Sequence, residues 1–358
     1  MGLIDLAIPA LFAFSPEKAH NLSLAGLKSG LVPSANLKDD RRLHVTVGGL
    51  EFTNPVGLAA GYDKNAEVPD AILRLGFGFT EVGTITPLAQ PGNPKPRIFR
   101  LTGDNAIINR LGFNNDGHAA ALAKLLARSS KSGIVGVNIG ANKDSPDFVA
   151  DYETGIDTFY DVASYFTANI SSPNTPGLRN LQAGEALEVL LKRIFDKVAA
   201  NTERTGKSVP VFLKIAPDLE YLEMDEISSV VKASKIAALI VSNTTLDRGM
   251  LKYTTHANET GGLSGQPLFE KSTKILAQMY KRLGDTIPLI GVGGVSSAKS
   301  AIAKIEAGAS LVQLYTGMVY AGPSLPSNIV RGLSRHLDQT GHANISELVG
   351  TRNEKWGA

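Results

Sequence analysis

The residues best suited to chemistry lie in one short segment, Asn169-Ile-Ser-Ser-Pro-Asn-Thr-Pro-Gly-Leu-Arg179. The apolar residues from Tyr165 to Ile170 predict a buried strand, and the prolines and glycine that follow end this strand in a turn. Asn169, Ser172 and Asn174 would therefore leave the strand end as amide and hydroxyl groups, which suit a small planar ligand better than a phosphate or a metal. An ordinary polar turn uses the same residue types, so the segment needs support from the rest of the chain.

A lysine ends a second apolar segment, Val211 to Ile215. Lys214 is not expected to be solvated there, and two uses fit it: a Schiff-base nucleophile with a lowered pKa, or a fixed positive charge beside a ring that becomes anionic. The alternative without function is a lysine whose ammonium group reaches solvent past the rim of the fold.

A set of asparagines accompanies these two segments. Its members follow predicted strands or lie in loops: Asn109, Asn138, Asn169, Asn174 and Asn243. Their spacing does not match a metal site, and no histidine accompanies them. Such a set would match the imide and carboxylate edge of a pyrimidine ring, although single members could be simple turn formers.

Glycine-rich segments late in the chain predict a phosphate site. Gly291-Val-Gly-Gly294 and Tyr315-Thr-Gly317 each follow an apolar segment, and Gly261 to Gly265 could add further backbone N–H donors. Glycines expose N–H groups, and a short helix can direct its positive end at an anion, so we expect a phosphate-bearing cofactor. Each cluster alone would also fit a tight turn.

The elements that must position these groups are apolar strand segments, most of them separated by helical patterns. The expected strands are Val56 to Ala60, Phe79 to Val82, Ile134 to Ile139, Tyr165 to Ile170, Val211 to Ile215, Ala237 to Ser242, Leu289 to Val292 and Leu311 to Tyr315. This series predicts a (β/α)₈ TIM barrel rather than a doubly wound sheet, with function at the carboxyl ends of the strands. A hairpin from Val45 to Phe52 would close the bottom, and the Pro- and Gly-rich residues from Gln90 to Gly112 would form a small excursion over the top.

Residues 1 to 40 predict a separate module of two short amphipathic helices, and residues 41 to 358 predict the barrel with a C-terminal tail. Leu3, Leu6 and Ala7 belong to the apolar face of the first helix. The second helix should have Ser15 as its N-cap and end at Gly30. Its apolar face would either dock on the barrel as a lid or lie in a membrane interface, and the pattern leaves both open.

Composition excludes several classes of function. The 358 residues carry 36 basic and 34 acidic side chains spread along the chain, which argues against nucleic-acid binding. The chain has no cysteine, so disulfides, thiolate metal sites and a thiol base are excluded, and we expect no metal. No apolar run is long enough to span a membrane. Asp5 and Pro9 also interrupt the N-terminal apolar residues, so we expect no signal peptide.

Five segments in a fixed order identify a family. They are Gly57-Leu-Ala-Ala-Gly-Tyr-Asp-Lys64, Asn109-Arg-Leu-Gly-Phe-Asn-Asn115, the segment from Asn169 to Arg179, Ser242-Asn-Thr-Thr-Leu-Asp-Arg248 and Gly261-Gly-Leu-Ser-Gly265. With them the chain resembles the quinone-dependent class 2 dihydroorotate dehydrogenases. The resemblance implies that (S)-dihydroorotate is oxidised to orotate in the synthesis of UMP, that flavin mononucleotide (FMN) accepts the hydride, and that ubiquinone or a related membrane quinone receives the electrons.

The resemblance also implies a role for each matching residue. Ser172 would be the catalytic base, where the soluble class has a cysteine, with Thr175 and Phe113 beside its proton path. Lys214 would hold the flavin and stabilise negative charge on its reduced ring. The other residues of the cofactor site would be Ala60, Gly61, Thr84, Asn138, Asn169, Ser242, Gly265, Gly294, Tyr315 and Thr316. The substrate site would be formed by Lys64, which pairs with the carboxylate, and by Asn109, Arg110, Leu111, Gly112, Phe113, Asn169, Asn174, Asn243 and Thr244.

The same resemblance bears on the N-terminal module. In this class two amphipathic helices rest on the membrane and open a quinone tunnel, so His20 and Arg100 would lie near the quinone head. We accordingly expect a monomeric, peripheral protein on the cytoplasmic side of a bacterial inner membrane. Tyr62 departs from the family pattern, which has a leucine-like residue at this position, and its hydroxyl would alter the packing beside the flavin.

Two other functions are compatible with parts of the pattern. A Schiff-base aldolase on the same barrel would use Lys214 as its nucleophile and the glycine segments for a substrate phosphate. A membrane-associated scaffold without catalysis would keep the barrel alone. The combined presence of Lys64, Ser172 and Lys214 argues against the scaffold.

Overall fold

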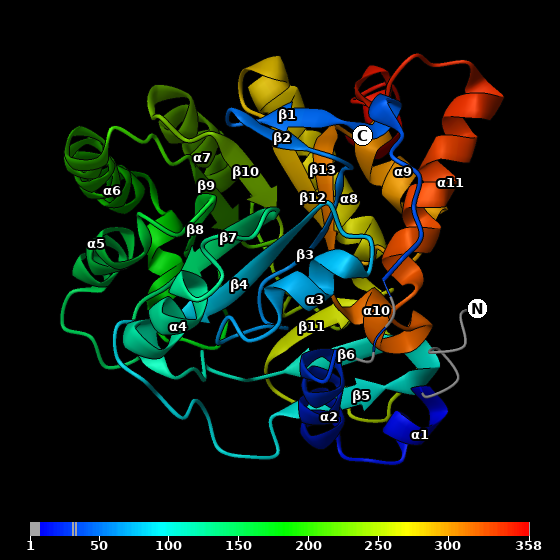
Figure 1. The fold of residues 1–358 in the computed structure, drawn as a ribbon, viewed down its shortest axis with the longest axis horizontal. Helices are drawn as coiled ribbons and strands as arrows, with labels where there is room; N and C mark the ends of the chain where they lie inside the picture. Colours follow the sequence, from blue (N-terminus) through cyan, green and yellow to red (C-terminus); the bar gives the residue numbers. More distant parts are fainter. Residues whose placement is uncertain (1–7, 31, 33, 358) are drawn as a thin grey trace.

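Eight parallel strands close into a barrel at the centre of the protein (Figure 1). The structure is a computed structural model that describes residues 8–30, 32 and 34–357. In chain order the barrel strands are β3 (Val56–Leu58), β4 (Phe79–Ile85), β7 (Ile134–Ile139), β8 (Tyr165–Asn169), β9 (Val211–Ile215), β10 (Ala238–Val241), β12 (Leu289–Val292) and β13 (Ala309–Leu314). Each predicted strand segment corresponds to one of them, so the predicted (β/α)₈ fold is confirmed.

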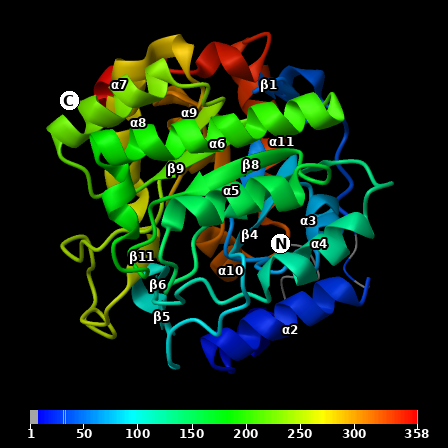
Figure 2. The ribbon, with the colours of Figure 1, turned by 90° about the vertical axis from the view of Figure 1, so that its left-hand side faces the viewer.

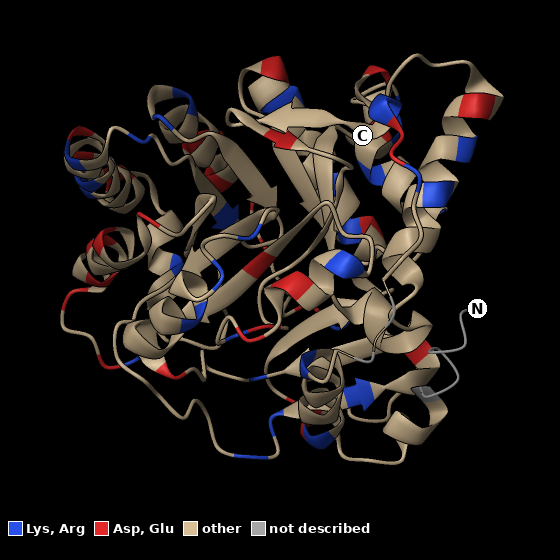
Figure 3. Ribbon diagram, viewed as in Figure 1, with Lys and Arg blue, Asp and Glu red and all other residues tan. Residues whose placement is uncertain are grey.

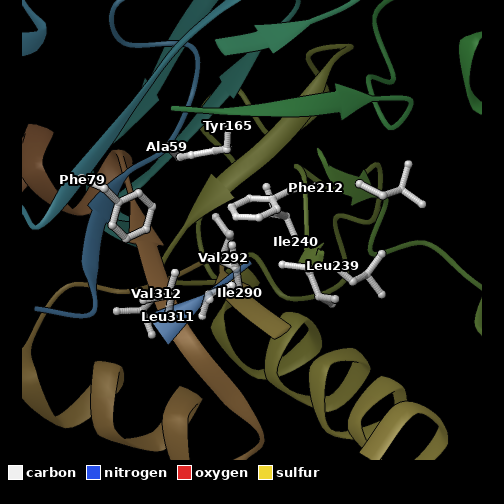
Figure 4. Close-up of a cluster of buried hydrophobic side chains, with 14 of the residues drawn as sticks. Ala59, Phe79, Tyr165, Phe212, Leu239, Ile240, Ile290, Val292, Leu311 and Val312 are labelled. Carbon is white, nitrogen blue, oxygen red and sulfur yellow. The ribbon is translucent and has the colours of Figure 1, made fainter. Parts of the chain in front are cut away.

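Buried aliphatic and aromatic side chains of the barrel form a cluster that includes Phe79, Tyr165 and Phe212 (Figure 4). Tyr165 stacks on Phe212 at 4.4 Å between ring centroids and meets Phe79 edge-on at 6.5 Å. Two glycines make room for these rings, because a Cβ atom at Gly57 would lie 2.2 Å from Phe79 and one at Gly136 would lie 2.1 Å from Tyr165. These rings come from the first residues of their strands, so the barrel is packed at its amino end and only the carboxyl end remains for a ligand.

Helices cover the outside of the barrel (Figure 2). They are α3 (Pro69–Arg74), α4 (Gly117–Leu126), α5 (Phe148–Phe159), α6 (Gly184–Thr205), α7 (Tyr221–Ala233), α8 (Leu268–Leu283), α9 (Ala298–Glu306) and α11 (Leu325–Thr340). Basic and acidic residues are interspersed over them rather than gathered on one face (Figure 3). The short helix α10 (Thr316–Ala321) follows β13 after Tyr315.

A two-stranded hairpin closes the amino end of the barrel, as predicted. It consists of β1 (Val45–Val47) and β2 (Leu50–Phe52), with Val45 paired to Phe52. A Cβ atom at Gly48 in its turn would lie 3.1 Å from both Pro210 and Ala237, which precede β9 and β10. The turn therefore packs closely under the barrel.

A small antiparallel sheet lies over the carboxyl end. Its strands are β5 (Ile98–Leu101), β6 (Ala106–Asn109) and β11 (Gly262–Gly265), with β6 in the centre. The expected excursion of residues 90–112 is therefore present. The segment 261–265, expected to add backbone N–H donors, is mostly a strand, because pairing with β6 imposes an extended backbone on a segment with little strand propensity of its own.

The N-terminal module contains two helices, α1 (Ile8–Phe12) and α2 (Pro16–Lys28), beside the small sheet (Figure 1). Ser15 occupies the N-cap position of α2, as predicted, and its side chain makes no capping hydrogen bond. Ion pairs fix α2 at both ends: Glu17 accepts from Arg97 at 2.7 Å and from Lys95 at 3.3 Å, and Lys28 donates to Glu67 at 2.6 Å. The predicted apolar positions Leu3, Leu6 and Ala7 lie outside the described residues. Within the described part of the chain, no helix is both long and apolar enough to cross a bilayer.

The C-terminal tail packs onto the barrel helices. The short helix α12 (Asn353–Gly357) lies against α8, and the buried amide of Asn353 donates hydrogen bonds to Ala277 O at 2.9 Å and Ala307 O at 2.8 Å. Asn353 thus joins the middle of α8 to the C-terminal end of α9 through one side chain.

Replacing Asn353 with alanine should lower the free energy of unfolding by about 1–3 kcal/mol, because two buried carbonyl groups lose their donor. The measurement is chemical denaturation of the full-length protein. The control is Asn328→Ala on the exposed side of α11, expected to change stability by less than about 0.5 kcal/mol. Equal stability of the two variants would contradict the role given to Asn353.

Candidate active site

A cavity opens at the carboxyl ends of the strands, between the barrel and the small sheet. The predicted residues that line it are Ala60, Gly61, Lys64, Thr84, Asn109, Leu111, Gly112, Phe113, Asn169, Ser172, Asn174, Lys214, Ser242, Asn243, Thr244, Gly265, Gly294, Tyr315 and Thr316. Parallel pairing places the strand ends at one level, for example Asn169 beside Lys214. Residues far apart in sequence are therefore gathered at one site.

A hydrogen-bonded chain of buried side chains forms the floor of this cavity. Asn138 donates to Glu81 at 2.6 Å and accepts from Thr84 Oγ1 at 2.6 Å, and Thr84 accepts in turn from Asn169 Nδ2 at 2.8 Å. Asn138 is itself fully buried and does not line the cavity. Its predicted contact with the cofactor stays a prediction, and in this structure its side chain orients Thr84.

The same chain continues into the polar side of the cavity. Ser171 Oγ donates to Asn169 Oδ1 at 2.9 Å and accepts from Asn243 Nδ2 at 2.9 Å. Asn174 Nδ2 donates to the carbonyl of Asn109 at 3.2 Å. These bonds fix the side-chain amides before any ligand arrives, which lowers the cost of ordering them on binding.

Lys214 lies at the bottom of the cavity with only 5% of its surface exposed. Its ammonium group makes no hydrogen bond or ion pair within the described residues. The charge of the Glu81 carboxylate acts on this ammonium group. Burial lowers the pKa of its ammonium group, and the charge of Glu81 partly opposes this. An anionic ligand in the cavity would restore the charged form.

Lys64 faces the same cavity from the loop after β3. The neighbouring Asp63 fixes this loop by accepting from the N–H groups of Glu67 at 2.7 Å and Val68 at 2.8 Å. Burial lowers the pKa of Lys64 to about 8. Its ammonium group also lacks a hydrogen bond or ion pair among the described residues, so the cavity offers two unpaired cations.

Ser172 lies in the turn after β8 and is 6% exposed. Its Oγ accepts a hydrogen bond from Asn174 N at 3.2 Å, which leaves the hydroxyl proton directed elsewhere. Arg179 braces the turn by donating to Ser171 O at 3.1 Å and to Asp218 at 3.1 Å. The predicted relay partner Thr175 is buried but does not line the cavity.

The predicted phosphate corner is formed by Gly265, Gly294 and Thr316. Gly294 has a φ of 73°, and a Cβ atom there would lie 2.4 Å from Phe269 Cβ, so only glycine fits. Thr316 Oγ1 lies 2.8 Å from Ser264 Oγ, which connects β11 to the start of α10. The corner is thus narrow, and backbone faces it from two sides.

Arg110 is placed differently from the prediction. Its guanidinium group donates to Glu259 at 2.7 Å and lies 4.5 Å from the centroid of Phe99, so it points into the small sheet rather than the cavity. It orders the loop that carries Leu111 and Gly112.

A second cavity lies between the N-terminal helices and the barrel. Its lining is mostly apolar and includes both residues predicted for a quinone, His20 and Arg100. Ile98, Ile107 and Tyr315 line both cavities. The two chambers are therefore separated by single side chains.

Tyr62 stands in this wall. Its ring meets His20 at 5.2 Å and Tyr315 at 5.6 Å, both edge-on, and its hydroxyl lies 2.9 Å from Ser23 Oγ of α2. Burial, with a smaller contribution from the charge of Lys64, lowers the pKa of His20 to about 3, so its imidazole is neutral. The hydroxyl of Tyr62 thus ties the N-terminal module to the barrel.

Sequence reasoning missed two residues of the floor network, Glu81 and Ser171. Glu81 is fully buried and accepts from Asn138, Thr167 at 3.1 Å and Gln313 at 2.9 Å. A single carboxylate inside an otherwise apolar strand was the signal that could have found it. Among the described residues, no group of three or more His, Asp or Glu side chains could hold a metal ion.

Comparison with known proteins agrees with the site. A sequence model of the family described as dihydroorotate dehydrogenase matches residues 42–337. The chain is 61% identical over 352 residues to a dihydroorotate dehydrogenase (quinone) of Allorhizobium ampelinum, covering 98% of this chain and 97% of that protein. It is 59% identical over 358 residues to the protein of that name from Brucella ovis, and the match covers 100% of this chain and 98% of that protein.

Solved structures give the same result. A crystal structure of DHODH in complex with ferulenol from Eimeria tenella superimposes with a TM-score of 0.92 at 39% identity, covering 96% of this chain and 98% of that chain. Barrel and site together define a (β/α)₈ oxidoreductase with its active site at the carboxyl ends of the strands. The chain belongs to the dihydroorotate dehydrogenase family, in its quinone-dependent class.

Proposed function

We propose that this protein oxidises (S)-dihydroorotate to orotate in pyrimidine synthesis and passes the electrons through FMN to a membrane quinone. The observation that carries the proposal is the gathering of Ser172, Lys64 and Lys214 around one cavity, together with the asparagine amides. Family membership favours this oxidoreductase over the Schiff-base aldolase and the scaffold without catalysis.

The cavity has the chemistry that FMN requires. The polar edge of the ring would face Lys214 and the hydrogen-bonded pair formed by Thr84 and Asn169. The phosphate would lie in the corner formed by Gly265, Gly294 and Thr316. When bound, this cofactor supplies a two-electron acceptor for the hydride from C6 of the substrate. The unpaired ammonium of Lys214 would favour negative charge on the ring.

The substrate would lie on the polar side of the same cavity. Lys64 would pair with its carboxylate, and Asn109, Asn174 and Asn243 would bind the amide and imide groups of its ring, with Asn169 and Thr244 beside them. Three of these amides are already held by hydrogen bonds to one another or to Ser171. The ring would therefore be oriented by fixed groups.

Ser172 would accept the C5 proton at Oγ while its own hydroxyl proton leaves through the predicted relay with Thr175, and the C5–C6 double bond would form as the hydride leaves C6. The hydrogen bond from Asn174 N to Ser172 Oγ would support negative charge on this oxygen during the exchange. A serine is a weak base in water, and the burial of Ser172 in a turn braced by Arg179 keeps bulk solvent away.

The N-terminal module would admit the quinone. Its apolar chamber, with His20 and Arg100 in the lining, meets the flavin cavity at Tyr315. A long-chain quinone could enter there from a bilayer while its head approaches the flavin edge. We propose peripheral binding to the cytoplasmic side of a bacterial inner membrane, with residues 1–40 as the membrane module, residues 41–358 as the catalytic barrel, and a monomer as the working unit.

Ser172→Ala should retain the flavin but reduce it roughly 10²- to 10⁴-fold more slowly, because proton removal loses its base. The measurement is single-turnover reduction by dihydroorotate under anaerobic stopped flow. Ser172→Cys, which replaces the hydroxyl with a thiol, should recover part of the rate. Near-normal reduction of the alanine variant would refute the base assignment.

Orotate affinity should fall as the pH rises above about 8. In the free protein the pKa of Lys64 is lowered to about 8, so its ammonium group is present below that pH and lost above it. In the complex the orotate carboxylate stabilises the ammonium form of Lys64. The dissociation constant should therefore rise roughly tenfold per pH unit above 8.

Spectral titration with orotate at several pH values between about 7 and 9 would test this. Lys64→Met should bind orotate weakly at every pH in this range, without the inflection. A constant affinity of the wild-type protein would contradict the pairing of Lys64 with the carboxylate.

Deleting residues 1–30 should spare reduction by dihydroorotate and impair reoxidation by a long-chain quinone. The truncation removes one wall of the apolar chamber and leaves the barrel cavity intact. Both half-reactions can be followed separately, with a small water-soluble electron acceptor as the control oxidant. Unchanged turnover with long-chain quinone would remove the tunnel hypothesis.

A further inference from the structure

A fully buried lysine lies behind the glycine turn of the predicted phosphate corner. Lys304 of α9 has no exposed surface, and its Nζ donates to Ser272 Oγ at 2.6 Å and to Val292 O at 3.3 Å. Its side chain passes against Gly291, where a Cβ atom would lie 3.2 Å from Lys304 Cβ. The strand that ends in the turn thus leaves room for this lysine.

No carboxylate neutralises Lys304 within the described residues. Glu306 is near it in sequence but pairs with Arg352 at 3.3 Å instead. The ring of Phe269 is a further favourable partner, with its centroid 5.3 Å from Nζ. Burial without a counter-ion lowers the pKa of Lys304 well below its ordinary value. A buried cation in this state is costly unless a ligand supplies the missing negative charge.

The hydrogen bonds of Lys304 lead to the cavity. Val292 and Gly293 both line it, and Ser272 Oγ lies 3.2 Å from the carbonyl of Gly293. Phe269 packs against Gly294 on the other side of the turn. The amine is therefore connected to the phosphate corner through Val292 directly and through Ser272, without touching the cavity itself.

We propose that Lys304 is a positioning residue for the cofactor phosphate, supplying a positive charge from behind the Gly293-Gly294 turn. The inference rests on the proposed FMN site. When the phosphate dianion occupies the corner, its charge favours the ammonium form of Lys304, and the ammonium strengthens the hydrogen bonds that hold the turn. A lysine with only a structural role would donate to Ser272 Oγ and Val292 O in the same way with or without a bound phosphate.

Competition between FMN and riboflavin separates these roles, because riboflavin lacks only the phosphate. The full-length holoprotein is equilibrated with mixtures of both flavins, and the bound flavin is identified by chromatography. In Lys304→Met the preference for FMN should fall by roughly tenfold or more, as expected for the loss of a charge that acts across a few ångströms of protein. Riboflavin affinity should stay near the wild-type value.

Two further variants complete the test. Lys304→Gln keeps hydrogen-bond donors for Ser272 but has no charge, and it should lose the preference as Lys304→Met does. Lys299→Met removes an exposed lysine from the same helix and should leave the preference unchanged. Equal losses of FMN and riboflavin affinity in the Lys304 variants, or an unchanged ratio, would overturn the proposal.

A measurement on the wild-type protein covers the case in which the variants fail to fold. At about pH 8 the phosphate of FMN is already a dianion, since its second pKa is about 6. Calorimetry in buffers of different ionisation enthalpy should then show more proton uptake for FMN than for riboflavin, and equal uptake would contradict the proposal. If the wild-type protein bound no FMN at all, the proposed function would fail instead.

Discussion

Two ammonium groups that nothing in the described protein neutralises determine what this cavity can bind. Lys64 and Lys214 both line it, neither forms an ion pair among the described residues, and burial lowers the pKa of each. Unpaired buried cations require anionic ligands. A carboxylate near Lys64 and a ring that gains negative charge near Lys214 would satisfy both, and this is why the site suits an anionic substrate beside a reducible cofactor.

The barrel makes this arrangement possible by being solid at one end and open at the other. Aromatic rings from Phe79, Tyr165 and Phe212 fill the amino end, where Gly57 and Gly136 leave them room. The floor network from Glu81 to Asn169 then fixes the polar groups above them. A ligand therefore meets prearranged donors at the carboxyl end, and the second chamber approaches the same place from the other side of Tyr315.

Much of this could be predicted from the sequence, because short apolar segments ending in polar or glycine clusters are the direct signature of barrel strands. The small sheet could not, since β11 is a glycine-rich segment that becomes a strand only by pairing with β6. Similarly, Arg110 belongs to a matching motif, but its contact with Glu259 depends on a loop distant in sequence. Motifs identify residues, whereas the direction of a long side chain depends on tertiary partners.

The most direct test of the account is the visible spectrum of the purified full-length protein before and after dihydroorotate is added without oxygen. The account predicts a yellow protein whose flavin absorbance is lost on addition of the substrate and returns when a quinone is supplied. A colourless protein able to bind orotate, or a flavin spectrum that dihydroorotate leaves unchanged, would contradict it.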